Sequence, residues 1–358
     1  MNTKSEYNPE YHTLSCQTIR ITLFVYVYVR VFAPETCVLD IFLNPLFYFL
    51  DGMALKIEEG KTFLHFIYRK FRTFIVPYFF LALLLVLLDT LLLPLEGMNM
   101  NLAYLRDSFI GIFRESRVYS LWYLPSLFFG ETIVYLSEKI TKESFIRKTA
   151  SLILILTLTL LYNAFLTYKL PLALDTSFIG SFYLYLGYLL MHEKAKKLRD
   201  FLFRSRLNSL IVAILLLSIS TVFALLIYKH YGVSFSGSKN QYSPYYFILP
   251  ASLIGTMGIV FLGYSIRNKV FHHIGGMTMI ILAFEEEVWI KIYKNLIARN
   301  WYQAFENYPR IWNIEEITCC FLGALFAVLL SVPLYYFFMK TPLCVIFNRK
   351  YQKTLTNT

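Results

Sequence analysis

The sequence predicts an all-α protein, a polytopic membrane bundle of about ten transmembrane helices. Of its 358 residues, 57% are hydrophobic and only 16% are charged, whereas soluble domains carry about 25% charged residues. Apolar runs that approach the roughly 20 residues of a bilayer span recur along the chain. Aromatic residues make up 18% of the chain, which suits the two interfaces of a membrane. Because backbone polar groups need partners in lipid, we expect these runs to be helices.

The candidate spans differ in how apolar they are. The first contains Arg20 and Arg30, and the ninth contains Glu285, Glu286 and Glu287. Prolines inside several others predict kinks, since proline removes a helix hydrogen bond. The ten segments are 18–33, 38–55, 73–95, 120–137, 149–168, 176–192, 207–229, 245–263, 271–290 and 317–339.

The loops between these segments alternate in charge. Loops 56–72, 138–148, 193–206, 264–269 and the tail 340–358 together carry 21 Lys and Arg residues, against 9 in the opposite set. Cytoplasmic loops carry the excess of basic residues, so both termini are expected in the cytoplasm. We expect one transmembrane domain over 18–340, a cytoplasmic segment over 1–17 and a basic cytoplasmic tail over 341–358.

Two function classes are excluded by composition and spacing. The net charge of +11 accompanies no nucleic-acid-binding motif and is explained by the basic loops. The five cysteines are odd in number and form no CxxC pair, which argues against a zinc site or a disulfide framework. We expect no metal and no nucleic-acid partner.

Five segments, in order and at plausible spacing, resemble the acyltransferase-3 family of membrane O-acyltransferases, most closely its fucose-4-O-acetylase-like branch. Each segment matches a short family pattern, and the similarity runs from about 19 to 290. The segments are Phe42–Gly52 (FLNPLFYFLDG), Arg69–Tyr78 (RKFRTFIVPY), Leu121–Phe128 (LWYLPSLF), Leu174–Leu190 with its Asp-Thr start and Gly-Tyr-Leu-Leu end, and Ile274–Met279 (IGGMTM).

The resemblance implies transfer of an acyl group, usually acetyl from acetyl-CoA, to a hydroxyl of a sugar or cell-surface polysaccharide. Acetyl-CoA would be a co-substrate that arrives from the cytoplasm, and no bound cofactor is expected. The acceptor glycan would lie at or beyond the outer face. Membrane lipid surrounds such a protein, and the bacterial inner membrane is the expected location.

The chain departs from the family at its histidines. The three positions fall on Val31, on Leu43 and near Phe284. Histidine suits acyl transfer to a hydroxyl because its ordinary pKa is about 6.5, so another base is needed here.

Glu285 and Asp51 are the candidate bases, with Arg30 as a third catalytic candidate. A buried Glu with a raised pKa acts as a base in other enzymes, but Glu285 also fits the outer interface or a pair with Arg30. Asp51 lies in or near a span, where ionisable residues are functional by default, and it also fits an ion pair. Arg30 suits an oxyanion or a donor oxygen, but its simpler role is an interfacial position or a pair with Glu285.

Arg69, Lys70 and Arg72 are the candidate donor-binding residues, because CoA carries several phosphates. Ordinary positive-inside charge explains them equally well. Trp122 and Asp175 are the candidate acceptor-binding residues. Their simpler roles are an interface anchor for Trp122 and a helix N-cap for Asp175.

Two readings without acyl transfer stay open at this point. The chain fits a catalytically inactive acyltransferase-like protein, which the missing histidines favour. It also fits a glycan-lipid transport or assembly protein, although no internal repeat of the kind found in many transporters is present.

Overall fold

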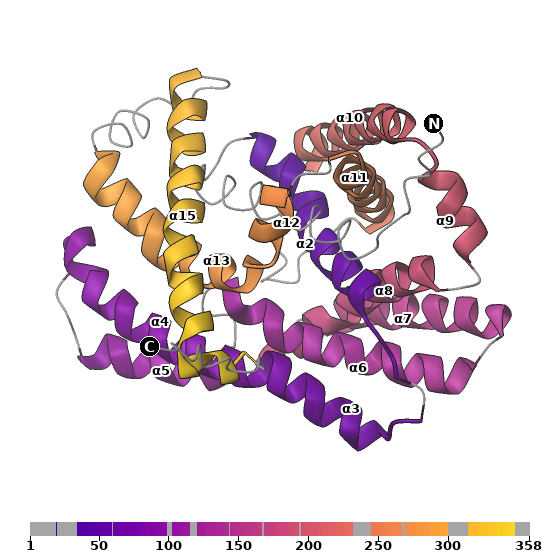
Figure 1. Ribbon diagram of the computed structural model, residues 1–358, viewed down its shortest axis with the longest axis horizontal. Coiled ribbons are helices and arrows are strands. Elements are labelled where there is room, and N and C mark those ends of the chain that lie inside the picture. The colour runs from indigo at the N-terminus through magenta and orange to yellow at the C-terminus, as the bar shows by residue number, and fades with distance from the viewer. Residues whose placement is uncertain are drawn as a thin grey trace, which may run out of the picture. The chain divides into compact units, whose positions relative to one another are not determined.

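The computed structural model describes residue 19 and the ranges 34–58, 60–98, 102–114, 120–142, 144–166, 168–192, 195–231, 245–266, 269–299 and 314–347. Every regular element within these ranges is a helix and none is a strand, which confirms the all-α prediction (Figure 1). Arg30 lies outside the described residues, as does the first expected span apart from residue 19.

The chain divides into two compact units, and α6 (Tyr123–Thr141) passes from one to the other. Unit 1 comprises Met1–Ile57, Phe129–Leu170 and Leu174–Thr278. Unit 2 comprises Glu58–Phe128, Pro171–Ala173 and Met279–Thr358.

Unit 1 is built around α2 and α8. Its main helices are α2 (Pro34–Ala54), α7 (Phe145–Phe165), α8 (Leu174–Met191), α10 (Arg206–Tyr231) and α11 (Tyr245–Ser265), with the shorter α9 (Lys196–Leu202) and α12 (Lys269–Gly275). Helix α2 packs against α8, α10 and α11, while α7 packs on α8 and α10 on α11. Figure 1 shows α10 and α11 side by side.

Glycines set the close approach of α2 to α8. A methyl group at Gly52 would overlap the carbonyl of Leu184, and one at Gly187 would overlap the carbonyl of Phe49. Small residues let membrane helices approach each other closely in this way. Polar contacts add to the packing of unit 1, since the hydroxyls of Tyr183 and Ser252 lie 2.6 Å apart.

Helices α7 and α10 present apolar side chains on their outer faces. Leu154, Leu158, Leu215 and Leu226 are all at least 49% exposed. An exposed apolar surface of this kind is unfavourable in water and normal in lipid. These faces therefore agree with a membrane location.

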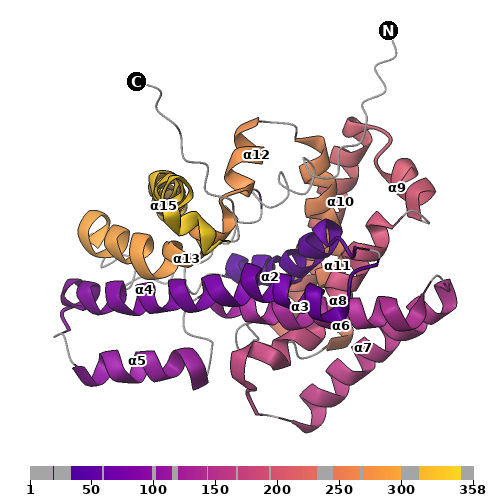
Figure 2. The same ribbon diagram turned by 60° about the horizontal axis from the view of Figure 1, so that its bottom comes forward.

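Unit 2 contains one long helical stretch, formed by α3 (Phe63–Lys70), the π-helix η1 (Phe71–Ile75) and α4 (Val76–Leu92). It starts at Thr62, whose hydroxyl accepts a hydrogen bond from the backbone N–H of His65 at 3.3 Å. The wide turn of η1 ends at Ile75, two residues before Pro77, which cannot donate a helix hydrogen bond. Figure 2 shows α3 and α4 in line, with α5 (Leu102–Arg114) beside α4.

The remaining elements of unit 2 come from the last part of the chain. They include α13 (Thr278–Phe284), the π-helices η6 (Glu285–Ile290) and η7 (Tyr293–Ile297), and α15 (Ile314–Lys340). The hydroxyl of Tyr78 on α4 donates to the carbonyl of Ile112 on α5 at 2.9 Å. The short turns η2 (Leu93–Glu96), η3 (Ser120–Trp122), η4 (Pro171–Ala173) and η8 (Pro342–Val345) complete the described elements.

Five described helical segments are long and apolar enough to cross a membrane. The expected count of ten spans is therefore not confirmed. The ninth expected span is not one helix, because turn residues Gly276 and Met277 separate α12 from α13 and the helix widens into η6 at Glu285. The five segments are Phe63–Leu95, Phe145–Phe165, Arg206–Ile227, Phe247–Ser265 and Thr318–Lys340.

Candidate active site

Glu285 opens the π-helix η6 and is fully buried. It directly follows α13, whose residues Ile280 to Phe284 are all buried. A π-helical turn is rare and occurs frequently at functional sites. Of the two candidate bases, Glu285 and Asp51, Glu285 therefore has an unusual backbone setting inside unit 2.

Aromatic and polar contacts join this segment to α15. The indole N–H of Trp289 donates to the Ser331 hydroxyl at 3.0 Å. The ring of Phe284 lies 6.1 Å from that of Phe338, measured between centroids. Ser331 is itself buried and donates to the carbonyl of Ala327 at 2.8 Å. One side of η6 is thus fixed to α15.

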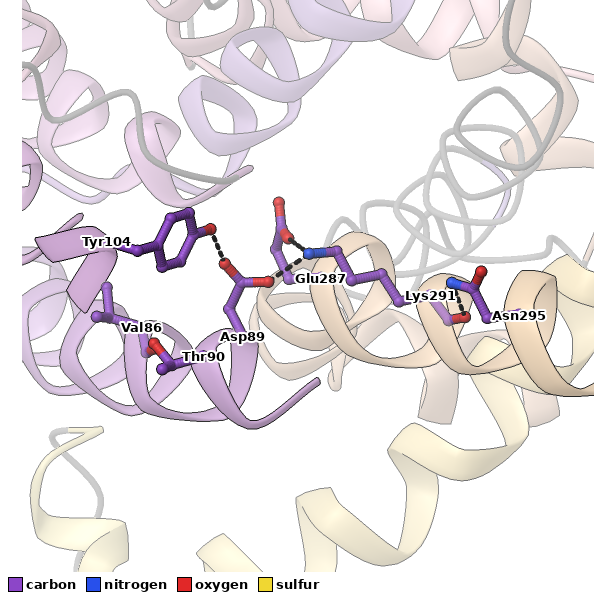
Figure 3. A network of polar contacts seen from close by, with 7 residues as sticks. All are labelled: Val86, Asp89, Thr90, Tyr104, Glu287, Lys291 and Asn295. Atoms are coloured by element: carbon purple, nitrogen blue, oxygen red, sulfur yellow. Dashed lines mark hydrogen bonds and ion pairs between the residues drawn. The ribbon is translucent and has the colours of Figure 1, made fainter. Parts of the chain in front are cut away.

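A network of charged groups joins the other side to α4 (Figure 3). The Lys291 ammonium contacts one carboxylate oxygen of Asp89, and it lies 3.2 Å from Glu287 one turn earlier. The second oxygen of Asp89 accepts a hydrogen bond of 2.5 Å from the hydroxyl of Tyr104 on α5. The consecutive helices α4 and α5 and the distant segment around Lys291 meet at Asp89.

Burial strengthens this network. Asp89 is only 1% exposed, and charge-assisted hydrogen bonds are stronger where water is excluded. Burial, together with the hydrogen bond and charge of Asp89, raises the pKa of Tyr104 to about 12. Burial lowers the pKa of Lys291, but the hydrogen bond that its ammonium donates to Asp89 and the charge of Glu287 outweigh this effect, so the net shift is upward. Both groups are therefore protonated at neutral pH.

The candidate donor-binding residues lie together on α3 and η1, but they differ in their contacts. Arg69 forms an ion pair with Glu58. Lys70 lies over the rings of Phe66 and Phe74, at 5.7 Å and 5.5 Å. Arg72 makes no ion pair or hydrogen bond among the residues that the structure describes, and it is half-buried.

The other candidate residues are distributed over both units. Asp51 is half-buried on α2, and Asp175 is buried in the first turn of α8, where the helix dipole favours a negative charge. Both belong to unit 1. Trp122 belongs to unit 2 and is only 4% exposed, with its ring against that of Tyr123. Arg30, and with it the expected pair with Glu285, lies outside the described residues.

Sequence reasoning missed Asp89 and its partners. Asp89 is the one charged residue in the expected span 73–95, and intramembrane ionisable residues are functional by default. That rule would have identified Asp89, but nothing in the sequence connects it with Lys291, about two hundred residues later. Among the described residues, no group of three or more His, Cys, Asp and Glu side chains is arranged to hold a metal ion.

A second buried cluster was also missed, in unit 1. The Lys148 ammonium lies 2.7 Å from Glu138 and 3.4 Å from the ring nitrogen Nε2 of His192. Glu138 also accepts a hydrogen bond from the Tyr185 hydroxyl at 2.9 Å. The cluster joins the end of α6 to the start of α7 and the end of α8.

Comparison with known proteins agrees with the resemblance seen in the sequence. The family model of the acyltransferase domain, acyltransferase-3, matches residues 12–336. Searches of curated proteins and of solved structures found no match. The match covers most of the chain and includes Glu285 and the network around Asp89. With its apolar helices, the chain therefore belongs to the acyltransferase-3 family and is an integral membrane acyltransferase.

Proposed function

We propose that the protein is a membrane O-acyltransferase that moves an acetyl group from acetyl-CoA to a hydroxyl of a sugar or cell-surface polysaccharide. The observation that carries this proposal is the position of Glu285, fully buried at the start of a π-helix within the region that matches the acyltransferase domain. Membership of the fucose-4-O-acetylase-like branch, with divergent histidine positions, is part of the proposal.

In the proposed reaction Glu285 is the general base. Its carboxylate takes the proton of the acceptor hydroxyl while the hydroxyl oxygen attacks the thioester carbonyl carbon. The carbon–sulfur bond then breaks, and the CoA sulfur leaves as a thiolate that takes up the proton. The products are the acetyl ester and free CoA, so protons and electrons balance. An ionised carboxylate can accept a proton from a hydroxyl, which is the role of a general base. Asp51 is the alternative base.

Arg72 is proposed to bind the phosphates of the donor, with Arg69 and Lys70 beside it. Arginine binds phosphate through two parallel hydrogen bonds, and Arg72 has no competing partner among the described residues. Glu58 and the two phenylalanine rings engage Arg69 and Lys70. We therefore assign the larger part of donor recognition to Arg72.

Trp122 of unit 2 and Asp175 of unit 1 are each proposed, as separate candidates, to contact the acceptor. The low content of Lys and Arg in loops 96–119 and 169–175 supports an outer location for both residues. The same charge pattern supports cytoplasmic termini and a donor that enters from the cytoplasm. The bacterial inner membrane is the proposed location.

A second candidate function is binding or assembly of a glycan-lipid without acyl transfer. The observation that favours it is the replacement of the family histidines at Val31 and Leu43 and near Phe284. Two measurements separate the candidates: binding of acetyl-CoA to the detergent-purified protein, and transfer of labelled acetyl into glycan by membranes with and without it. Donor binding together with protein-dependent labelling supports the enzyme. Binding of glycan-lipid without donor binding contradicts it.

A further inference from the structure

The π-helix η6 is held from two sides within unit 2. On one side Trp289 bonds Ser331 of α15 at 3.0 Å. On the other side Lys291, directly after η6, contacts Asp89 of α4. Figure 3 shows the Asp89 carboxylate between the Tyr104 hydroxyl and the Lys291 ammonium. Contacts to two different helices therefore fix both the position and the rotation of η6.

Such external contacts matter more for a π-helix than for an α-helix. The wider i→i+5 turn is rarely stable by itself and occurs mostly as single turns. Its backbone geometry therefore depends on the side chains that anchor it. Glu285 is the first residue of η6 and Lys291 follows its last residue, so a rotation at Lys291 is transmitted through one short helical segment to Glu285.

We propose that Asp89 and Lys291 are positioning residues for acyl transfer, because their ion pair holds η6 in the rotation that aims the Glu285 carboxylate at the acceptor hydroxyl. The proposal rests on the proposed function of Glu285. Tyr104 completes the arrangement by fixing the second oxygen of Asp89 at 2.5 Å.

The contacts favour a structural clamp, by which we mean the Asp89–Lys291 ion pair that holds η6 in place, over a site that binds a ligand. Asp89 is 1% exposed, and both of its carboxylate oxygens are engaged by other side chains. The Lys291 ammonium contacts two carboxylates, those of Asp89 and Glu287. Groups that satisfy each other in this way hold elements together. An acceptor would have to displace contacts that already exist.

The first test measures two reactions in each variant. Transfer of labelled acetyl into membrane glycan needs the acceptor, whereas hydrolysis of acetyl-CoA by the purified protein uses water and yields acetate and CoA. Lys291→Met and Asp89→Asn are each expected to lower kcat of both reactions by about 10- to 100-fold, as expected for a misplaced catalytic group. KM for acetyl-CoA is expected to stay unchanged. Lys291→Arg keeps the charge and the donors and is expected to restore both reactions.

Loss of one charge leaves its partner buried and unpaired, and this alone can impair folding. The double variant Asp89→Asn/Lys291→Met removes both charges and is therefore expected to fold better than either single variant. A purely structural pair predicts that activity returns with folding, whereas a positioning pair predicts that activity stays low. Thr90→Ala is the matched control on α4, because among the described residues its hydroxyl bonds only the Val86 carbonyl of its own helix, at 2.7 Å.

The second test needs no activity. Trp289 lies inside η6, so its fluorescence reports the clamp once the signal of the same protein with Trp289→Phe is subtracted. Lys291→Met is expected to increase iodide quenching of Trp289, and Lys291→Arg is expected to leave it unchanged. If the wild-type protein neither transfers acetyl to glycan nor hydrolyses acetyl-CoA, the proposed function is wrong. Iodide quenching of Trp289 then still decides whether the ion pair holds η6 in place.

Three results would overturn the inference. The first is unchanged quenching of Trp289 in Lys291→Met. The second is loss of transfer with full acetyl-CoA hydrolysis, because that split would show Lys291 binding the acceptor. The third is recovery of activity in the double variant. Loss of both reactions, rescued by Lys291→Arg and accompanied by increased quenching, supports the inference.

Discussion

Gly52 of α2 and Gly187 of α8 lie at reciprocal contacts, each facing a backbone carbonyl of the other helix. Gly52 faces Leu184, and Gly187 faces Phe49. Both glycines come from segments that resemble the acyltransferase-3 patterns, and the structure gives them a packing role. Asp51, next to Gly52, is thereby held near the crossing of the two helices.

Gly187→Ala is expected to destabilise the protein by about 1–3 kcal/mol, because the added methyl group forces α2 and α8 apart. Thermal unfolding in detergent measures the change. Ala54→Val is the matched control, since it adds methyl groups at an exposed position near the end of α2. Equal stability of wild type and Gly187→Ala would show that the helices do not approach this closely.

Lys148→Met is expected to destabilise the protein by about 3–5 kcal/mol, because it leaves the carboxylate of Glu138 buried without its cation. The side chains of Lys148 and Glu138 are only 5% and 10% exposed. The double variant Glu138→Gln/Lys148→Met should recover much of this loss in the same unfolding assay. If the two single effects simply add, the ion pair is not a coupled unit.

Arg72→Ala is expected to raise KM for acetyl-CoA about tenfold or more, because a charge-assisted contact to phosphate contributes roughly 1.5–3 kcal/mol. Arg69→Ala should have a smaller effect, since Glu58 already engages Arg69. Initial rates at varied acetyl-CoA concentration give KM for acetyl-CoA in both variants. A larger effect at Arg69 than at Arg72 would contradict the assignment of the donor site.

The raised pKa of Tyr104 predicts that the protein loses stability at alkaline pH. Its pKa is raised from the ordinary value of 10.0 to about 12, first by burial and then by Asp89. A folded-state pKa above the unfolded value favours the protonated form in the folded protein. The stabilisation is therefore complete below pH 10 and is lost as the pH rises towards 12. Between pH 9 and pH 12 the free energy of unfolding should fall less steeply with pH in Tyr104→Phe than in wild type. Identical slopes in the two proteins would show that Tyr104 is not the source of this pH dependence.

The sequence was sufficient for the fold class because long apolar runs indicate helices locally. Nine of the ten expected spans overlap described helices, although only five helical segments meet the length and composition of a span. The turn that separates α12 from α13 was not predicted. A count of apolar residues alone does not distinguish one continuous helix from two helices joined by apolar turn residues. Gly275 and Gly276 were the available signal, because glycine weakens a helix.

The sequence could suggest single candidate residues of the site but not the contacts between them. Charge in an apolar segment made Glu285 and Asp51 candidates, and the resemblance made Arg72 a candidate. The partners of a buried charge depend on tertiary packing, so Asp89, Tyr104 and Lys291 are linked only in the structure. For the same reason the different contacts of Arg69, Lys70 and Arg72 could not be read from three neighbouring basic residues.

The role of Glu285 as general base is tested by transfer of labelled acetyl from acetyl-CoA into glycan by membranes that carry either wild type or Glu285→Gln. The amide keeps the shape of the side chain but cannot accept the proton, so we expect protein-dependent labelling in wild type and a loss of about 100-fold or more in the variant. Asp107→Asn, an exposed change on α5 with a side chain 64% exposed, should label like wild type. Full labelling by folded Glu285→Gln would show that Glu285 is not the general base.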